Sequence, residues 1–285
     1  MAESPTILYR SRSVRHYLWP PTLWRNLWQH RDLIWQLTRR EVAAMYRGAS
    51  LGTLWSLLLP LAMLVVYTFV FSVVLEAKFP QAVTQSKAEF AITLFAGLLL
   101  FTVFGDCANA ATTLVTAHAS YVKRVVFPLE VLPVVKVGAA LVNAVISLGI
   151  LLVGTLVFLH RIPLTVFWLP VVALPLLLLT LGVSWFLASL GVYIRDTAQV
   201  VRVVVNLLFF TTPIFYPISQ VPKPLQVLVY LNPLTAIVED GRRVLIWGQS
   251  PNWIPLLATL VAAAAVMQLG YTWFMKTRRG FADVL

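Results

Sequence analysis

The stretch GASLGTLWSLLLPLAMLVVYTFVFSVVL, residues 48–75, decides the fold because none of its 28 residues is charged. An α-helix rises about 1.5 Å per residue, and the hydrocarbon core of a bilayer is about 30 Å thick. About 20 apolar residues therefore span a membrane, and this stretch exceeds that length. It predicts a transmembrane helix close to the N-terminus.

Five further charge-poor stretches follow the first one. The chain has 285 residues, of which 59% are hydrophobic and 12% are charged, whereas a soluble domain carries about 25% charged residues. The further stretches cover residues 90–116, 137–159, 162–194, 203–222 and 244–275. The sequence thus predicts an all-α integral membrane fold with six transmembrane helices, and no separate soluble domain.

The distribution of Lys and Arg predicts the orientation, because these residues are retained on the cytoplasmic side of a membrane. With both termini inside, 16 of the 22 Lys and Arg residues face the cytoplasm. The six on the outer side are Lys78, Lys87, Arg161, Lys223, Arg242 and Arg243. The net charge of +11 is therefore a consequence of topology. We expect no nucleic-acid partner, because the chain contains no recognisable nucleic-acid-binding module.

The N-terminal segment divides into two parts. Residues 1–21 are polar and basic without an apolar period, so we expect a flexible tail. In residues 22–47, leucines alternate with arginines, and Trp24, Trp28 and Trp35 supply rings suited to the headgroup layer. This pattern predicts an interfacial helix on the inner leaflet, held by membrane lipids. Whether a protein partner also docks on it is left open.

Two connecting segments are more patterned than simple turns. Residues 119–130, ASYVKRVVFPLE, lie between the second and third predicted spans and suit a short helix at the cytoplasmic mouth that slots into another protein. Residues 217–248 lie in a proline-rich region, with five prolines between Pro213 and Pro233. Proline interrupts helices, so we expect two short helices there, over 222–231 and 234–247, that dip back into the outer leaflet. The alternative is a plain interfacial loop that caps the bundle.

Several chemistries have no motif in the sequence. There is no G-x-x-x-x-G-K-[ST] phosphate loop, so energy from ATP has to come from another subunit. The only cysteine is Cys107, and the four histidines are scattered, so we predict no metal site, no catalytic residue and no cofactor in this chain. Asp106 is the one acid inside a predicted span. It either bonds between helices or carries a proton.

Residues 33–75 resemble the N-terminal region of ABC-2 type permeases that export polysaccharides, including O-antigen and teichoic acid. The resemblance is carried by Arg40-Glu41, Tyr46-Arg47, Leu51-Gly52, Leu54-Trp55 and Leu59-Pro60. A second matching region runs from Arg195-Asp196 through Thr212-Pro213-Ile214-Phe215-Tyr216 to Leu231-Asn232-Pro233. The likeness covers nearly the whole chain after residue 22, as one ABC-2 transmembrane domain over 22–285.

The resemblance implies a homodimer of six-span subunits joined to two ATP-binding cassette subunits, which would bind ATP and Mg²⁺. Such a complex would pass a lipid-linked glycan across the bacterial inner membrane. In this family the interfacial helix and the loop at 119–130 receive the motion of the ATPase. The residues that we assign to this coupling are Arg39, Arg40, Glu41, Lys123, Arg124 and Phe127. Residues 217–248 correspond to the periplasmic gate region.

Aromatic residues gather in sequence around the expected gate, and sugar rings stack on aromatic faces. We assign Phe209, Phe210, Phe215, Tyr216, Tyr230 and Trp247 to the substrate channel and gate, with core packing as the alternative. Arg40, Arg47 and Arg195 are candidates for the carrier lipid's diphosphate, although positive-inside anchoring explains them equally well.

Two rival functions remain open at this point. One is an ABC-2 permease for drugs or other lipids, which would share the fold and offer a narrower path. The other is a membrane-embedded glycosyl- or acyltransferase. That rival requires a cluster of catalytic acids or histidines on one membrane side, and the sequence shows none.

Overall fold

The computed structural model describes residues 19–45, 54–74, 76, 78–82, 86–122 and 127–285. Within these ranges the regular structure is entirely helical, which confirms the predicted all-α class. Of the tail predicted over 1–21, residues 1–18 lie outside the described residues, whereas Pro20 and Pro21 already begin a helix, since proline is favoured in the first turn of a helix. Residues 48–53, the start of the first predicted span, also lie outside the described residues.

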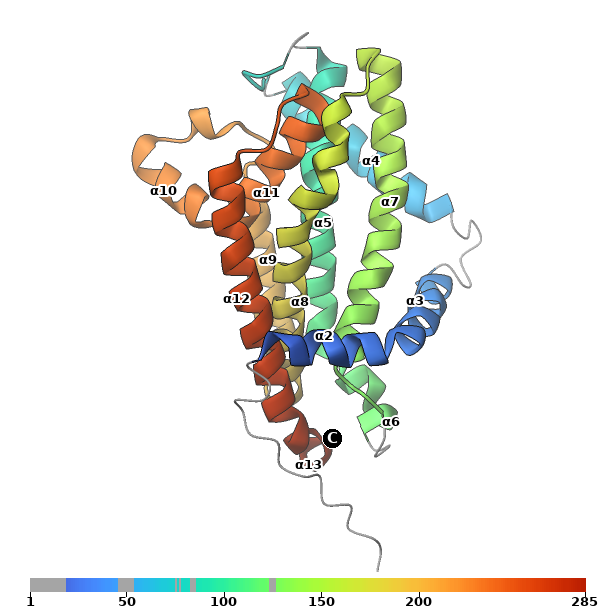
Figure 1. Ribbon diagram of the computed structural model, residues 1–285. Helices are drawn as coiled ribbons and strands as arrows, with labels where there is room; N and C mark the ends of the chain where they lie inside the picture. Colours follow the sequence, from blue (N-terminus) through green and yellow to red (C-terminus); the bar gives the residue numbers. More distant parts are fainter. Residues whose placement is uncertain (1–18, 46–53, 75, 77, 83–85, 123–126) are drawn as a thin grey trace, which may run out of the picture.

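Four long helices run side by side and form the body of the molecule (Figure 1). They are α5 (Lys87–Leu114), α7 (Val131–Leu159), α8 (Leu169–Tyr193) and α12 (Trp253–Thr277). The short turn Leu164–Trp168 leads into α8. All four are long and apolar enough to cross a bilayer, so the chain is a multi-pass membrane protein.

Two shorter apolar helices accompany these four. Helix α4 (Trp55–Thr68) continues into a π-helical turn, Phe69–Val74, and α9 covers Thr197–Thr211. Their apolar parts, Pro60–Val74 and Thr197–Thr211, are shorter than a full span. The first lies within the first predicted span, 48–75. The second overlaps the fifth predicted span, 203–222, only up to Thr211, because Pro213 follows the end of the helix. The count of six spans stays a prediction.

Helix α5 lies at the centre of the bundle. In its most apolar stretch 83% of the residues are buried within the subunit, against 11% in α7. Helices α4, α7, α8, α9 and α11 all pack against α5. The apolar surface that α7 leaves uncovered is the surface that a membrane protein presents to lipid or to another subunit.

The predicted interfacial helix over 22–47 is two helices, α2 (Pro20–Gln29) and α3 (Arg31–Met45). They lie across the bundle rather than along it (Figure 1). The break falls at His30, whose backbone leaves the helical region at φ −104° and ψ 15°. In α2, Leu23 is fully buried, whereas Trp24 and Trp28 are 55% and 70% exposed. The tryptophans therefore point away from the bundle.

The two short helices predicted from the prolines are present. They are α10 (Lys223–Leu231) and α11 (Pro233–Arg242), the latter extended by the π-helical turn Arg243–Trp247. They lie toward the end of the bundle opposite to α6 (Ala119–Val122) and to α13 (Phe281–Val284), which follows α12 (Figure 1). Helices α10 and α11 thus lie near one end of the long helices, and the short helices α6 and α13 lie near the other end.

Candidate functional site

Polar side chains meet near the crossing of α2 at a group that we call the inner node, formed by Asn26, Glu130, Trp185, Tyr271 and Arg278. Glu130 ends the 119–130 loop and is only 4% exposed. Its carboxylate accepts a hydrogen bond from Asn26 Nδ2 at 2.8 Å and forms an ion pair with Arg278. Its backbone carbonyl accepts a hydrogen bond from Trp185 Nε1 at 2.9 Å.

The inner node connects four parts of the chain. Asn26 belongs to α2, Trp185 to α8 and Tyr271 to α12, while Arg278 directly follows α12. Asn26 Nδ2 also donates to the Tyr271 hydroxyl oxygen at 3.0 Å. A buried ion pair that loses one partner leaves an uncompensated charge, which costs about 3–5 kcal/mol. The node therefore holds these parts in one arrangement.

The residues assigned to ATPase coupling do not form one cluster in the described part of the chain. Lys123 and Arg124 lie outside the described residues. Arg39 and Arg40 are exposed on α3, whereas Glu41 forms an ion pair with Lys136 of α7 at 2.7 Å. Glu41 thus attaches α3 to α7 within the chain.

Phe127, the remaining coupling candidate, is half-buried. Its ring stacks on Tyr121 with 4.4 Å between centroids, and Tyr121 stacks on His118 at 5.5 Å. These three rings join the two ends of the 119–130 loop. The stack fixes the shape of the loop where it leaves and returns to the bundle.

A second polar centre, which we call the outer anchor, is built on Arg242 at the end of α11. Arg242 is fully buried, and its guanidinium donates to the backbone carbonyls of Thr93 at 3.2 Å, Pro213 at 2.6 Å and Ile214. It also pairs with Glu239 at 3.1 Å. The guanidinium fork carries five donors in fixed directions, which suits several acceptors at once.

The sequence analysis counted Arg242 among the six cations on the outer side, and the structure buries its side chain fully within the subunit. Its guanidinium carbon lies 4.6 Å from the centroid of the Phe79 ring, so an aromatic face covers the charge. Gly97 of α5 leaves the necessary space, because a Cβ there would lie 2.9 Å from Arg242 Nη2. The burial of this arginine depends on contacts between distant parts of the chain, so no local sequence pattern predicts it.

Two separated stretches that carry the family resemblance meet beside the outer anchor. Asn232 Nδ2 donates to Thr212 Oγ1 at 2.9 Å, and Asn232 Oδ1 accepts from the Leu234 N–H at 3.0 Å. Asn232 therefore caps α11 and ties it to the segment that follows α9. The Thr212-Pro213 and Asn232-Pro233 elements are therefore joined in one structural unit.

Asp240 connects α11 to the start of α12. Its Oδ1 accepts from the Asn252 N–H at 2.7 Å and lies 3.8 Å from Arg243 Nε. Burial raises the pKa of the Asp240 carboxyl, while the Asn252 N–H and the Arg243 guanidinium act in the opposite direction. A carboxylate at a helix N-terminus also interacts favourably with the helix dipole.

Four of the six aromatic gate candidates lie together. Phe215 is buried and stacks on Phe71 at 4.5 Å between ring centroids, and Phe209 lies 5.1 Å from both Phe215 and Phe101. Phe210 lies 5.3 Å from Phe209 and is 62% exposed. Tyr216 donates its hydroxyl proton to the carbonyl of Phe210 at 3.0 Å.

The other two gate candidates lie elsewhere. Tyr230 is 65% exposed on α10, and Trp247 is buried in a separate apolar cluster with Ile92, Leu151 and Val172. The sequence analysis missed Tyr67, Phe71 and Phe101, which complete the aromatic cluster around Phe215 and Phe209. They are spread over the first two predicted spans, so spacing along the sequence does not group them.

The arginines considered for a lipid diphosphate lie on different elements. Arg40 is exposed on α3, and Arg195 is exposed just after α8. Arg47 lies outside the described residues.

Comparison with known proteins places the chain in a family. Residues 32–245 match the profile of the ABC-2 type transporter family. The chain is 30% identical over 261 residues to the O-antigen export system permease protein RfbA of Myxococcus xanthus, covering 91% of this chain and 97% of the relative. A protein of the same name from Klebsiella pneumoniae is 24% identical over 89% of this chain and 95% of the relative. The polysialic acid transport protein KpsM of Escherichia coli is 23% identical over 76% of this chain and 82% of the relative. With most of its length matched, the chain belongs to the ABC-2 type transporter family.

Proposed function

We propose that this chain is the membrane subunit of an ATP-driven exporter that moves lipid-linked polysaccharide, such as O-antigen, across the bacterial inner membrane. The relatives named for O-antigen export match it along nearly their whole length, so the likeness is not confined to one shared segment. Both termini face the cytoplasm in this proposal. ATP and Mg²⁺ bind to two partner cassette subunits, since the sequence has no phosphate loop.

The inner node supports the proposed coupling between the ATPase and the membrane helices. The interfacial helices and the 119–130 loop are the two elements that would receive the motion of the ATPase. Glu130 joins them through Asn26 and connects both to α8 and α12 through Trp185 and Arg278. Because Glu130 contacts α2 and Arg278 through its carboxylate and α8 through its backbone carbonyl, a displacement of the loop moves α12 as well as α2.

The apolar surfaces of α4, α9 and α10 support a homodimer with six spans per subunit. On α4, Val65 is 68% exposed. On α9, Phe210 is 62% exposed, and on α10, Leu231 is 73% exposed. In the proposed dimer a second copy covers part of these faces, and α4 and α9 serve as the first and fifth spans. The glycan then passes between the two copies, beside the aromatic cluster.

The two helices of the 217–248 region have different roles in the proposed gate. Helix α11 is fixed by Arg242, Asp240 and Asn232. Helix α10 buries only Val229 against the rest of the subunit. Since fewer contacts hold it, α10 is the element that moves when the outer leaflet end opens. Arg40, Arg47 and Arg195 are assigned to the phosphates of the carrier lipid on the inner side.

Deletion of the gene in its native host tests the function. We expect loss of long surface glycan on lipopolysaccharide gels, with lipid-linked polymer accumulating inside the cell, and recovery on complementation. Unchanged surface glycan would contradict the proposal and favour an ABC-2 permease for drugs or other lipids. Loss of the polymer without internal accumulation would instead indicate an enzyme of synthesis.

A further inference from the structure

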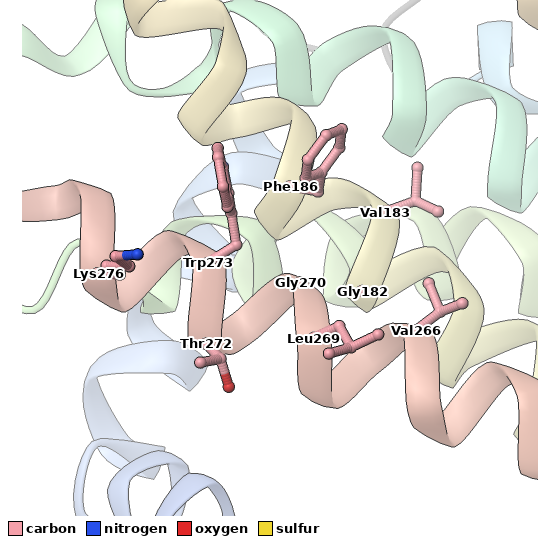
Figure 2. Close-up of a pocket in the computed structure, with 9 residues that line it drawn as sticks. All are labelled: Gly182, Val183, Phe186, Val266, Leu269, Gly270, Thr272, Trp273 and Lys276. Carbon is pink, nitrogen blue, oxygen red and sulfur yellow. The ribbon is translucent and has the colours of Figure 1, made fainter. Parts of the chain in front are cut away.

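A groove of about 390 Å³ runs between α8 and α12 on the surface of the bundle (Figure 2). Its lining is apolar apart from Thr272, whose hydroxyl donates to the Gln268 carbonyl, and Lys276 at one end. Phe186 and Leu269 at its rim are 41% and 62% exposed, so the groove opens to the surroundings of the subunit. The full lining is Gly182, Val183, Phe186, Val266, Leu269, Gly270, Thr272, Trp273 and Lys276.

The groove exists because two glycines meet where the helices cross. A Cβ on Gly270 would lie 2.1 Å from the Gly182 carbonyl oxygen, so the two backbones are in contact there. Small residues at such crossings let helices in membranes approach closely. The missing side chains leave a trough, and the Phe186 and Trp273 rings border it with 5.8 Å between their centroids.

The length of the groove matches one leaflet of a bilayer. Val266 and Lys276 mark its two ends on α12 (Figure 2). Ten residues of α-helix rise about 15 Å, which is half of the roughly 30 Å thickness of the hydrocarbon core. If Lys276 lies at headgroup level, the apolar part of the groove therefore extends to about the bilayer midplane.

The charge at the end of the groove has no partner in the described part of the chain. Lys276 is exposed and takes part in no ion pair or hydrogen bond with any described residue. Trp273 lies about one helical turn before it, and tryptophan is enriched at the level of lipid headgroups. An apolar trough about one leaflet long, with an exposed cation at one end, complements a lipid with an anionic headgroup.

We propose that this groove binds one acyl chain of an anionic phospholipid of the inner leaflet, with the lipid phosphate paired to Lys276. The choice of leaflet rests on the proposed function, in which both termini are cytoplasmic. Lipid tails fill any apolar groove in a bilayer, so selectivity comes from the charge. One lysine near an anionic surface favours anionic lipid by about fivefold.

Native mass spectrometry of the purified full-length subunit tests the selectivity. The protein in detergent is mixed with phosphatidylglycerol or with phosphatidylcholine of the same acyl chains, and the retained lipids are counted. We expect a preference of about fivefold for phosphatidylglycerol, lost in Lys276→Gln and kept in Arg279→Gln, an exposed cation outside the groove. A Lys276→Gln variant with the wild-type preference would overturn the proposal.

Fluorescence locates the acyl chain independently of charge. Phosphatidylglycerol with brominated chains quenches nearby tryptophans, and the difference between wild type and Trp273→Phe isolates Trp273. We expect strong quenching of Trp273, and equal quenching in both proteins would overturn the site. Displacement of the lipid by equimolar polyprenyl phosphate would assign the groove to the carrier and also overturn the proposal. Neither readout requires transport, so unchanged surface glycan in the deletion strain together with the expected lipid selectivity would contradict the proposed function alone.

Discussion

The Glu130 carboxylate and the Arg278 guanidinium form an ion pair across 148 positions of sequence, with side chains that are 5% and 21% exposed. The pair closes the end of the bundle near which α2 crosses, because Arg278 follows the last long helix and Glu130 ends the 119–130 loop. A cation placed after an apolar helix ordinarily faces water and lipid phosphates. Here it is used to hold a loop against the bundle.

Replacement of Glu130 by Gln is expected to lower the free energy of unfolding by about 3 kcal/mol, because the ion pair with Arg278 is lost in a mostly buried position. Thermal unfolding of the detergent-solubilised protein measures the effect. Arg279→Gln, at an exposed position one residue further on, should leave the melting temperature unchanged. If the double variant Glu130→Gln, Arg278→Gln loses the full sum of the two single effects, the two side chains do not interact.

Removal of the Arg242 guanidinium is expected to be among the most destabilising single changes in α10 and α11. Arg242→Met retains apolar bulk but leaves the carbonyls of Thr93, Pro213 and Ile214 without this donor. Each buried group that loses its partner costs about 1–3 kcal/mol. Unfolding by heat or denaturant checks this, with Arg161→Met as an exposed outer control. Similar stability of the two variants would contradict the role of the outer anchor.

Cysteine labelling is expected to report the topology. Glu76 and Lys223 are both exposed, so Glu76→Cys and Lys223→Cys should react with an impermeant maleimide in intact cells. Cys107 is 1% exposed and should add little background. A cysteine at Arg279, also exposed, should react only after lysis. The opposite pattern would place both termini outside and reverse the proposed direction of the molecule.

The sequence predicted elements whose cause is local and missed those whose cause is distant contact. Helices α10 and α11 were predictable, because prolines limit where a helix can start, and Pro233 stands at the first position of α11. The burial of Arg242 was not predictable, since its hydrogen-bond acceptors are the backbone carbonyls of Thr93, Pro213 and Ile214. Likewise the break at His30 interrupts an amphipathic pattern that continues on both sides of it.

The crossing of α8 and α12 is expected to tolerate no side chain at Gly270. In Gly270→Ala the new Cβ would lie 2.1 Å from a backbone oxygen, so the helices have to separate. Gly149→Ala is the matched control, since a Cβ there meets nothing within 4 Å. Alanine is favoured over glycine in a helix interior by about 0.5–1 kcal/mol, so the control should be neutral or slightly stabilised. Equal melting temperatures for the two variants would contradict the close crossing.

Two residues of the aromatic cluster are expected to have different roles, Phe215 in packing and Phe210 in transport. Phe215 is 2% exposed, and its replacement by Ala is expected to cost about 3–5 kcal/mol of stability. Phe210 is 62% exposed on α9, so Phe210→Ala should lower the stability of the isolated subunit far less.

If Phe210 faces the glycan path of the proposed dimer, Phe210→Ala should reduce export of surface glycan at normal protein levels. The comparison requires both variants in the same deletion strain, with the amount of membrane-inserted protein and the length of the surface glycan measured together. Normal export by a well-expressed Phe210→Ala would remove this residue from the path, since a stacking platform for sugar rings has no function without its ring.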